Sequence, residues 1–115
     1  MSNRDLAESL CEASKALAEA RIAHEAKFGN LIPHVFMGDV VARLGACLRA
    51  DGKGPRVRNA SEIAGILRFL EEGIANGDAE TRNVVAFSFA GGEGMEPILA
   101  ALGPLLGPRI RAQLA

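Results

Sequence analysis

One histidine of this 115-residue chain stands near a carboxylate, which is the first place to look for chemistry. His34 and Asp39 could act as a base and the acid that orients it, a common arrangement for proton transfer. A spacing of five residues on a helix, however, puts two side chains about 140° apart, so the two groups cannot easily meet. In the structural alternative, His34 shapes a helix start after Pro33, and Asp39 pairs with Arg43 one turn later. The sequence favours this alternative, and we expect no enzyme.

Metal, nucleophile and phosphate chemistry have little support in the sequence. Zinc needs about four ligands, and the chain has no CxxC, HxxxH or HExxH pair, so we expect no metal and no cofactor. His24 falls on an apolar stripe, where a hydrogen-bonded, partly buried imidazole is expected. Ser88 lacks the surroundings of a nucleophile elbow and is expected to bond back to a helix carbonyl. The glycines at 91–94 lack the Lys-Ser/Thr of a phosphate-binding loop.

Two sets of residues therefore remain as candidates with a structural or binding role. Polar residues set among apolar neighbours are expected to be structural: His34, Asp39, Asn83 and Ser88. Acidic residues lie off the apolar stripe of the first predicted helix, and such a face would suit a basic protein partner through electrostatic steering. The glycine-rich segment could adapt to a partner. The candidate partner-binding residues are Glu8, Glu12, Glu19, Gly92 and Glu93.

Composition narrows the class of protein. The chain is 49% hydrophobic and 23% charged, as globular proteins are, and its formal net charge is -1. With 13 basic residues against 14 acidic ones, nothing favours nucleic acid. No apolar run approaches the roughly 18 residues of a membrane span. Cys11 and Cys47 are expected to be reduced thiols, and the first residues do not read as a signal peptide, so we expect a cytoplasmic protein.

Apolar residues recur every three or four positions and predict an all-α, single-domain protein over residues 1–115. The stretch 83–89 would also suit a buried strand, but Asp78 is a good helix cap and no other strand is available for pairing. The result is an irregular bundle of five to six helices, or alternatively a curved stack. The predicted helices cover about Asn3–Lys27, a segment that begins near Leu31 to Pro33 and ends near Arg49, about Ala60–Asn76, a segment after Asp78, a segment from Pro97 that Pro104 kinks or ends, and Pro108–Leu114.

Packing can be predicted for two of these helices. Gly38 and Gly45 share one stripe of the second helix, which indicates that another backbone packs close there, because glycine costs about 1 kcal/mol inside a helix. A helix that is apolar on most sides must be central, so the helix after Asp78 is expected in the middle. The predicted core face of the second helix is Ile32, Val35, Phe36, Val40, Leu44 and Leu48.

Three segments together resemble a known family. They read LIPHVFMGD (31–39), ILRFLE (66–71) and TRNVVAFSF (81–89). They are similar to segments of an uncharacterised family of small bacterial all-helical proteins, in which a leucine–leucine–proline–histidine helix start precedes glycine–aspartate and a later helix carries asparagine and then serine–phenylalanine. The chain departs from the family after Phe89, where Ala90-Gly91 replaces leucine–glutamate. Members look like immunity proteins, encoded beside toxins that kill competing bacteria.

Three functions are therefore open. The resemblance implies an immunity protein that binds and occludes a cognate toxin. An apolar C-terminal segment, Ile98–Leu114, would instead suit a homodimer or another homo-oligomeric structural or regulatory domain. The third hypothesis is a small enzyme that uses His34 and Asp39.

Overall fold

The computed structural model describes residues 1–50, 57–90 and 95–114, and all regular elements in these ranges are helical. The all-α prediction is confirmed, although the described part has seven α-helices where five to six helices were expected. They are joined by a π-helix, η1, and a 3-10 turn, η2. The elements are α1 (Asn3–Ala13), α2 (Lys15–Phe28), α3 (Pro33–Ala50), α4 (Val57–Asn76), α5 (Ala79–Asn83), η1 (Val84–Ala90), α6 (Glu96–Leu102), η2 (Gly103–Leu105) and α7 (Pro108–Leu114).

The first predicted helix is two helices, because Ser14 interrupts it. Ser14 has an extended backbone (φ -145°, ψ 116°), and its hydroxyl accepts a hydrogen bond from the Leu17 N–H at 3.2 Å. The serine therefore ends α1 and caps α2, as a short hydroxyl side chain can when it competes with the helical backbone. The start of α1 follows the sequence prediction, since Ser2 and Asp5 form a reciprocal capping box.

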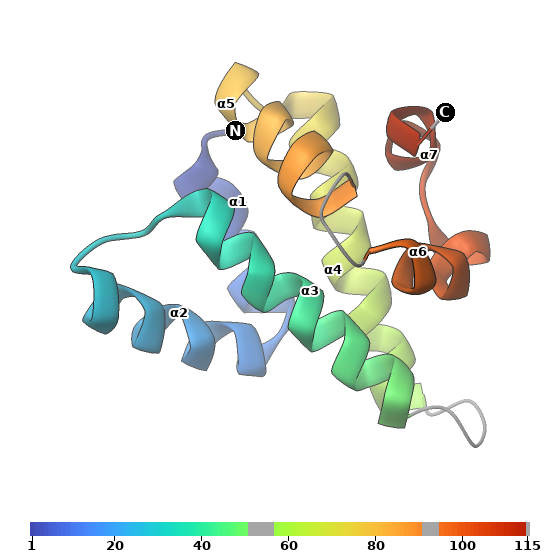
Figure 1. Cartoon of the computed structure of the whole chain (residues 1–115), viewed down its shortest axis with the longest axis horizontal. Coiled ribbons are helices and arrows are strands. Elements are labelled where there is room, and N and C mark those ends of the chain that lie inside the picture. The colour runs from blue at the N-terminus through green and yellow to red at the C-terminus, as the bar shows by residue number, and fades with distance from the viewer. Residues whose placement is uncertain (51–56, 91–94, 115) are drawn as a thin grey trace.

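The longest helix, α4, packs against α1, α3 and α7, while α3 also contacts α2 and η1. In Figure 1, α3 crosses in front of α4, with α2 on one side and η1 on the other. The buried core draws on all the α-helices except α5, and on η1. Its largest fully buried side chains include Phe89, Leu10, Leu17, Met37, Leu44, Ile66 and Leu70.

The ambiguous stretch 83–89 is helical, as predicted, and consists of the last residue of α5 and most of η1. Asp78 caps α5 by accepting a hydrogen bond from the Thr81 N–H at 2.9 Å. Val84 and Val85 are buried in the core. Phe87, however, is 70% exposed. The expectation that this helix lies in the middle, enclosed on all sides, is therefore wrong. The helix is buried on one side because that side packs against α3 and α4.

Glu71 of α4 holds the start of α7 in place. Its carboxylate accepts hydrogen bonds from the Arg109 N–H at 2.7 Å and the Ile110 N–H at 3.0 Å, and so caps the start of α7. A Cβ at Gly107 would lie 2.6 Å from this carboxylate, which explains the glycine. As predicted, Pro108 begins the last helix, and the preceding helix has ended before Pro104.

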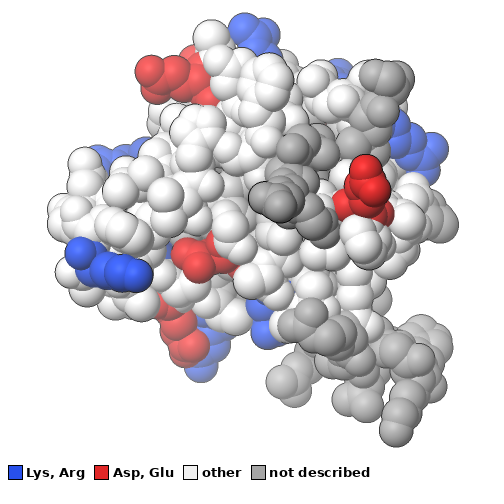
Figure 2. All heavy atoms as spheres, viewed as in Figure 1, with Lys and Arg blue, Asp and Glu red and all other residues white. Residues whose placement is uncertain are grey.

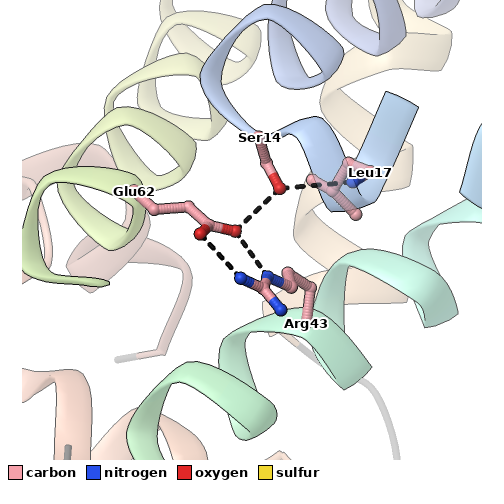
Figure 3. A network of polar contacts seen from close by, with 4 residues as sticks. All are labelled: Ser14, Leu17, Arg43 and Glu62. Carbon is pink, nitrogen blue, oxygen red and sulfur yellow. Dashed lines mark hydrogen bonds and ion pairs between the residues drawn. The ribbon is translucent and has the colours of Figure 1, made fainter. Parts of the chain in front are cut away.

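A polar network joins α1, α2, α3 and α4 (Figure 3). Glu62 accepts two hydrogen bonds from the Arg43 guanidinium, one of them at 2.8 Å, and one from the Ser14 hydroxyl at 2.7 Å. The expected pairing of Asp39 with Arg43 is therefore wrong. Arg43 reaches across to α4, where it gains a bidentate geometry that one turn of its own helix does not offer.

Hydrogen bonds from Arg43 hold the pKa of the Glu62 carboxyl below its usual value, against the opposing effect of burial. In the unfolded chain the Glu62 carboxyl has a pKa of about 4.3. Between the lower pKa of the folded state and this value, the unfolded state binds more protons than the folded state. Stability contributed by Glu62 is therefore present above this interval and lost as the pH falls through the folded pKa. We expect the difference in unfolding free energy between the wild type and Glu62→Gln to be largest above about pH 5 and to shrink toward pH 2. Urea unfolding across this range measures it, and a difference that stays constant would contradict this assignment.

Candidate partner-binding surface

Over positions 33–48 of α3, the exposed residues carry no charge, and the charged residues Asp39 and Arg43 are half-buried. The exposed residues there are His34, Val35, Gly38 and Ala42. The outer face of a surface helix usually carries charged and polar side chains. Figure 2, which views the molecule from the same side as Figure 1, shows uncharged atoms over most of the described surface around α3. This composition is unusual for a face that water alone covers.

Large apolar side chains extend this uncharged area to the turn between α2 and α3. Phe28 is 44% exposed, Ile32 is 38% exposed and Val35 is 46% exposed. Gly29 ends α2 in the left-handed conformation (φ 78°), so the chain reverses there. We call the exposed set Phe28, Ile32, Val35, Gly38 and Ala42 the α2–α3 surface. The predicted burial of Ile32 and Val35 in the core is therefore wrong.

A hollow of about 430 Å³ lies between α2 and α3 at this surface. Alanines on α2 leave the room for it, since longer side chains at these positions would fill the space. We call it the α2–α3 hollow. It is lined by Ala20, Ala23, His24, Lys27, Phe28, Val35 and Asp39.

His24 closes one side of the α2–α3 hollow and fixes the turn. Its Nε2 accepts a hydrogen bond from the Ile32 N–H at 2.9 Å, and the residue is 5% exposed. Its ring also contacts Phe28 and Phe36, with centroids 4.9 Å and 6.0 Å away. The predicted hydrogen bond of this imidazole is confirmed, and the ring is more deeply buried than the partial burial that was expected. Because the bond spans the turn, it helps to fix the position of the exposed apolar side chains.

Asp39 lines the α2–α3 hollow as a half-buried carboxylate. None of the described residues forms a hydrogen bond or ion pair with it, and Arg43 is engaged by Glu62. Lys27, across the hollow, instead places its ammonium 5.3 Å from the centroid of the Phe28 ring. The chain therefore offers Asp39 no close internal cation in its described part.

Gly38 is exposed, and a Cβ added there would meet no atom within 4 Å. The expectation that another part of the chain packs against this glycine is wrong, although Gly45 on the same stripe is buried. Gly38→Ala is therefore expected to raise the free energy of unfolding by about 0.5–1 kcal/mol, because alanine favours the helix. Urea unfolding measures the change. Gly65→Ala is the control, since its Cβ would lie 3.2 Å from the Ala13 Cβ and should stabilise less. Equal gains would contradict this reasoning.

A second, polar hollow of about 310 Å³ lies where α3 meets α5 and η1. Here the His34 Nδ1 is hydrogen-bonded to the Ser88 Oγ. Ser88 therefore bonds to a side chain of α3, and the expected bond to a helix carbonyl is wrong. Segments 31–39 and 81–89 thus meet at this point. The lining residues are Asn3, Pro33, His34, Glu80, Asn83 and Val84.

The possible catalytic pair of the sequence analysis is not brought together. His34 lines the polar hollow, whereas Asp39 lines the α2–α3 hollow. A serine beside a histidine is also a possible nucleophile and base, but that chemistry needs a third group to orient the imidazole. Within the described part of the chain, His34 hydrogen-bonds only to Ser88. The contact joins α3 to η1.

The predicted acidic partner surface is divided in the structure. Glu8 and Glu12 are exposed on α1 and Glu19 is exposed on α2, but the extended Ser14 between them breaks the helical phase. Gly92 and Glu93 lie outside the described residues.

The apolar C-terminal segment covers most of its own apolar surface. Leu102, Leu106 and Ile110 are buried, while Ile98 and Leu99 pack against the core as partly buried residues. Leu105 alone among the large apolar residues described there is strongly exposed, at 56%. Among the described residues of this segment, Leu105 is therefore the one strongly exposed apolar side chain that favours a homodimer.

No family model, curated protein or solved structure matches this chain. Across residues 1–50, 57–90 and 95–114, no three His, Cys, Asp or Glu side chains are grouped so as to hold a metal ion. None of the helices in those ranges is long and apolar enough to cross a bilayer.

Proposed function

We propose that this chain is a protein-binding module, an immunity protein that occludes a bacterial toxin in the cytoplasm. The observation that carries the proposal is the α2–α3 surface, where Phe28 and Val35 stand exposed beside an uncharged helix face. Exposed apolar patches of this kind mark protein interaction sites. The resemblance of segments 31–39, 66–71 and 81–89 to immunity proteins gives the class of partner.

The composition of the α2–α3 surface fits the centre of an interface. Such centres are depleted in charge and rich in aromatic and aliphatic side chains, while the rim is polar. Phe28, Ile32 and Val35 supply the apolar part, and Lys27 and Asp39 stand beside it. An exposed glycine at position 38 also lets a partner backbone approach α3 closely. These features replace the acidic face of the first helix as the proposed contact.

Occlusion does not require a catalytic group on this chain. A stable interface covers about 800 Å² on each partner, which is enough to cover a substrate entrance. The function then depends on shape and affinity alone. The experiment is to identify the genes adjacent to this one and to co-express the chain with a toxin domain that they encode. The proposal predicts restored growth and a stoichiometric complex, and an unrelieved toxin with no complex would contradict it.

A homo-oligomeric domain is the second candidate, and exposed Leu105 is the observation that favours it. Light scattering at micromolar concentration separates the two. A monomer is expected under the proposed function. A dimer that Leu105→Glu dissociates would instead support the homo-oligomer.

A further inference from the structure

We propose that the α2–α3 hollow receives an arginine side chain of the protein partner, whose guanidinium binds the Asp39 carboxylate. The inference rests on the proposed protein-binding function and adds the chemistry by which the partner is recognised. Its elements are a half-buried carboxylate, an apolar lining and a cavity of suitable size.

The carboxylate is the first element. Asp39 is half-buried and makes no hydrogen bond or ion pair with the described residues. Arg43, one turn along α3, is turned away toward Glu62. A carboxylate that loses water without gaining a partner is destabilised, and interface formation would bury it further. A cation supplied by the bound protein removes that cost, because charges across an interface are complementary.

The lining selects arginine over lysine. Ala20, Ala23 and Val35 offer apolar walls, and the Phe28 ring lies on the same hollow. A guanidinium is planar, more weakly hydrated than an ammonium and able to stack on an aromatic ring while it binds a carboxylate through two N–H groups. The position of the Lys27 ammonium over Phe28 shows that this ring already has a cation near its face.

Two other titratable groups on α2 line the hollow with Asp39. Lys27 is exposed and more than 4 Å from the carboxylate, so it can move aside for an incoming side chain. His24 uses its Nε2 to accept the Ile32 N–H, and among the described residues that line the hollow Asp39 is the one carboxylate. At about 430 Å³, the hollow lies within the range of about 300–1,000 Å³ typical of ligand pockets.

The test is an NMR titration of the full chain with N-acetyl-arginine amide. We expect saturable shifts of backbone amides around the α2–α3 hollow, with a dissociation constant of a few millimolar. Asp39→Asn is expected to weaken this binding about fivefold or more. Glu96→Gln, which removes an exposed carboxylate on α6, should leave it within about twofold of the wild type. N-acetyl-norleucine amide, which has an apolar stem and no charge, should bind at least fivefold more weakly.

Three results would overturn the inference: no saturable binding, equal binding by Asp39→Asn, or equal binding of the norleucine compound. The proposed function is tested separately by toxin binding. If Val35→Glu abolishes the toxin complex while Asp39→Asn does not affect it, the arginine inference fails and the protein-binding surface stands. If Val35→Glu has no effect on the complex, the proposed surface fails, whatever the titration shows.

Discussion

Replacing Val35 by glutamate is expected to weaken the complex with the toxin by at least about a hundredfold. The substitution replaces an apolar contact at the centre of the α2–α3 surface with a charged carboxylate, which complex formation would strip of water. A hundredfold change corresponds to about 2.7 kcal/mol, which is within the cost of burying such a charge. Isothermal titration with the purified toxin domain measures the loss.

The fold should tolerate this change. Val35 is 46% exposed, and exposed positions usually change stability by no more than about 0.5 kcal/mol. Ala64→Glu is the matched control, since it introduces the same charge at an exposed position of α4, outside the α2–α3 surface. It should leave the affinity unchanged. An affinity for Val35→Glu equal to that of this control would show that the toxin binds elsewhere.

Glu62→Gln is expected to lower the free energy of unfolding by about 2 kcal/mol. The change removes the charge that holds the Arg43 guanidinium, and it weakens the bond from Ser14 at the break between α1 and α2. The loss is smaller than for a fully buried pair, because the Arg43 side chain is 32% exposed. Thermal and urea unfolding measure it.

The control for this prediction lies on the same helix. Glu72 pairs with Arg68 at 3.7 Å, one turn away, and the Arg68 side chain is 72% exposed. Removing that charge with Glu72→Gln should change stability by less than about 0.5 kcal/mol, as is usual for exposed ion pairs. Similar effects of the two substitutions would mean that the Glu62 network contributes no more than a surface pair.

Local chemistry predicted much of the helical framework. Pro33 and Pro108 begin helices because proline fixes the first-turn backbone and needs no donor there. Asp78 caps α5, as its type and place predicted. His24 forms a hydrogen bond, as its position on an apolar stripe predicted. These features depend on a few neighbouring residues, so a sequence is sufficient to find them.

The break at Ser14 escaped prediction for a physical reason. Leu10 and Leu17 are seven residues apart, which is the spacing of two turns in a continuous helix. The apolar pattern therefore continues across the break at Ser14. The position three residues after Ser14 is Leu17 itself, which cannot complete a capping box. The bond from Ser14 to Glu62 spans 48 residues, and no local pattern predicts a contact of that range.

The sequence did not predict the candidate site, because an apolar residue can lie either in the core or at an interface. Val35 and Phe36 are adjacent and both apolar, yet consecutive residues point about 100° apart on a helix. Packing buries Phe36 at 2% exposure and leaves Val35 at 46%. The surroundings of Asp39 were not predicted either, because its predicted partner Arg43 forms an ion pair with Glu62 on α4 instead.

Hydrogen exchange of backbone amides in the free chain and in the toxin complex tests the proposed interface most directly. Protection on binding should concentrate in residues 24–42, which contain the end of α2, the turn and the exposed part of α3. Protection confined to the acidic positions of α1, or to the C-terminal helices α6 and α7, would contradict the account.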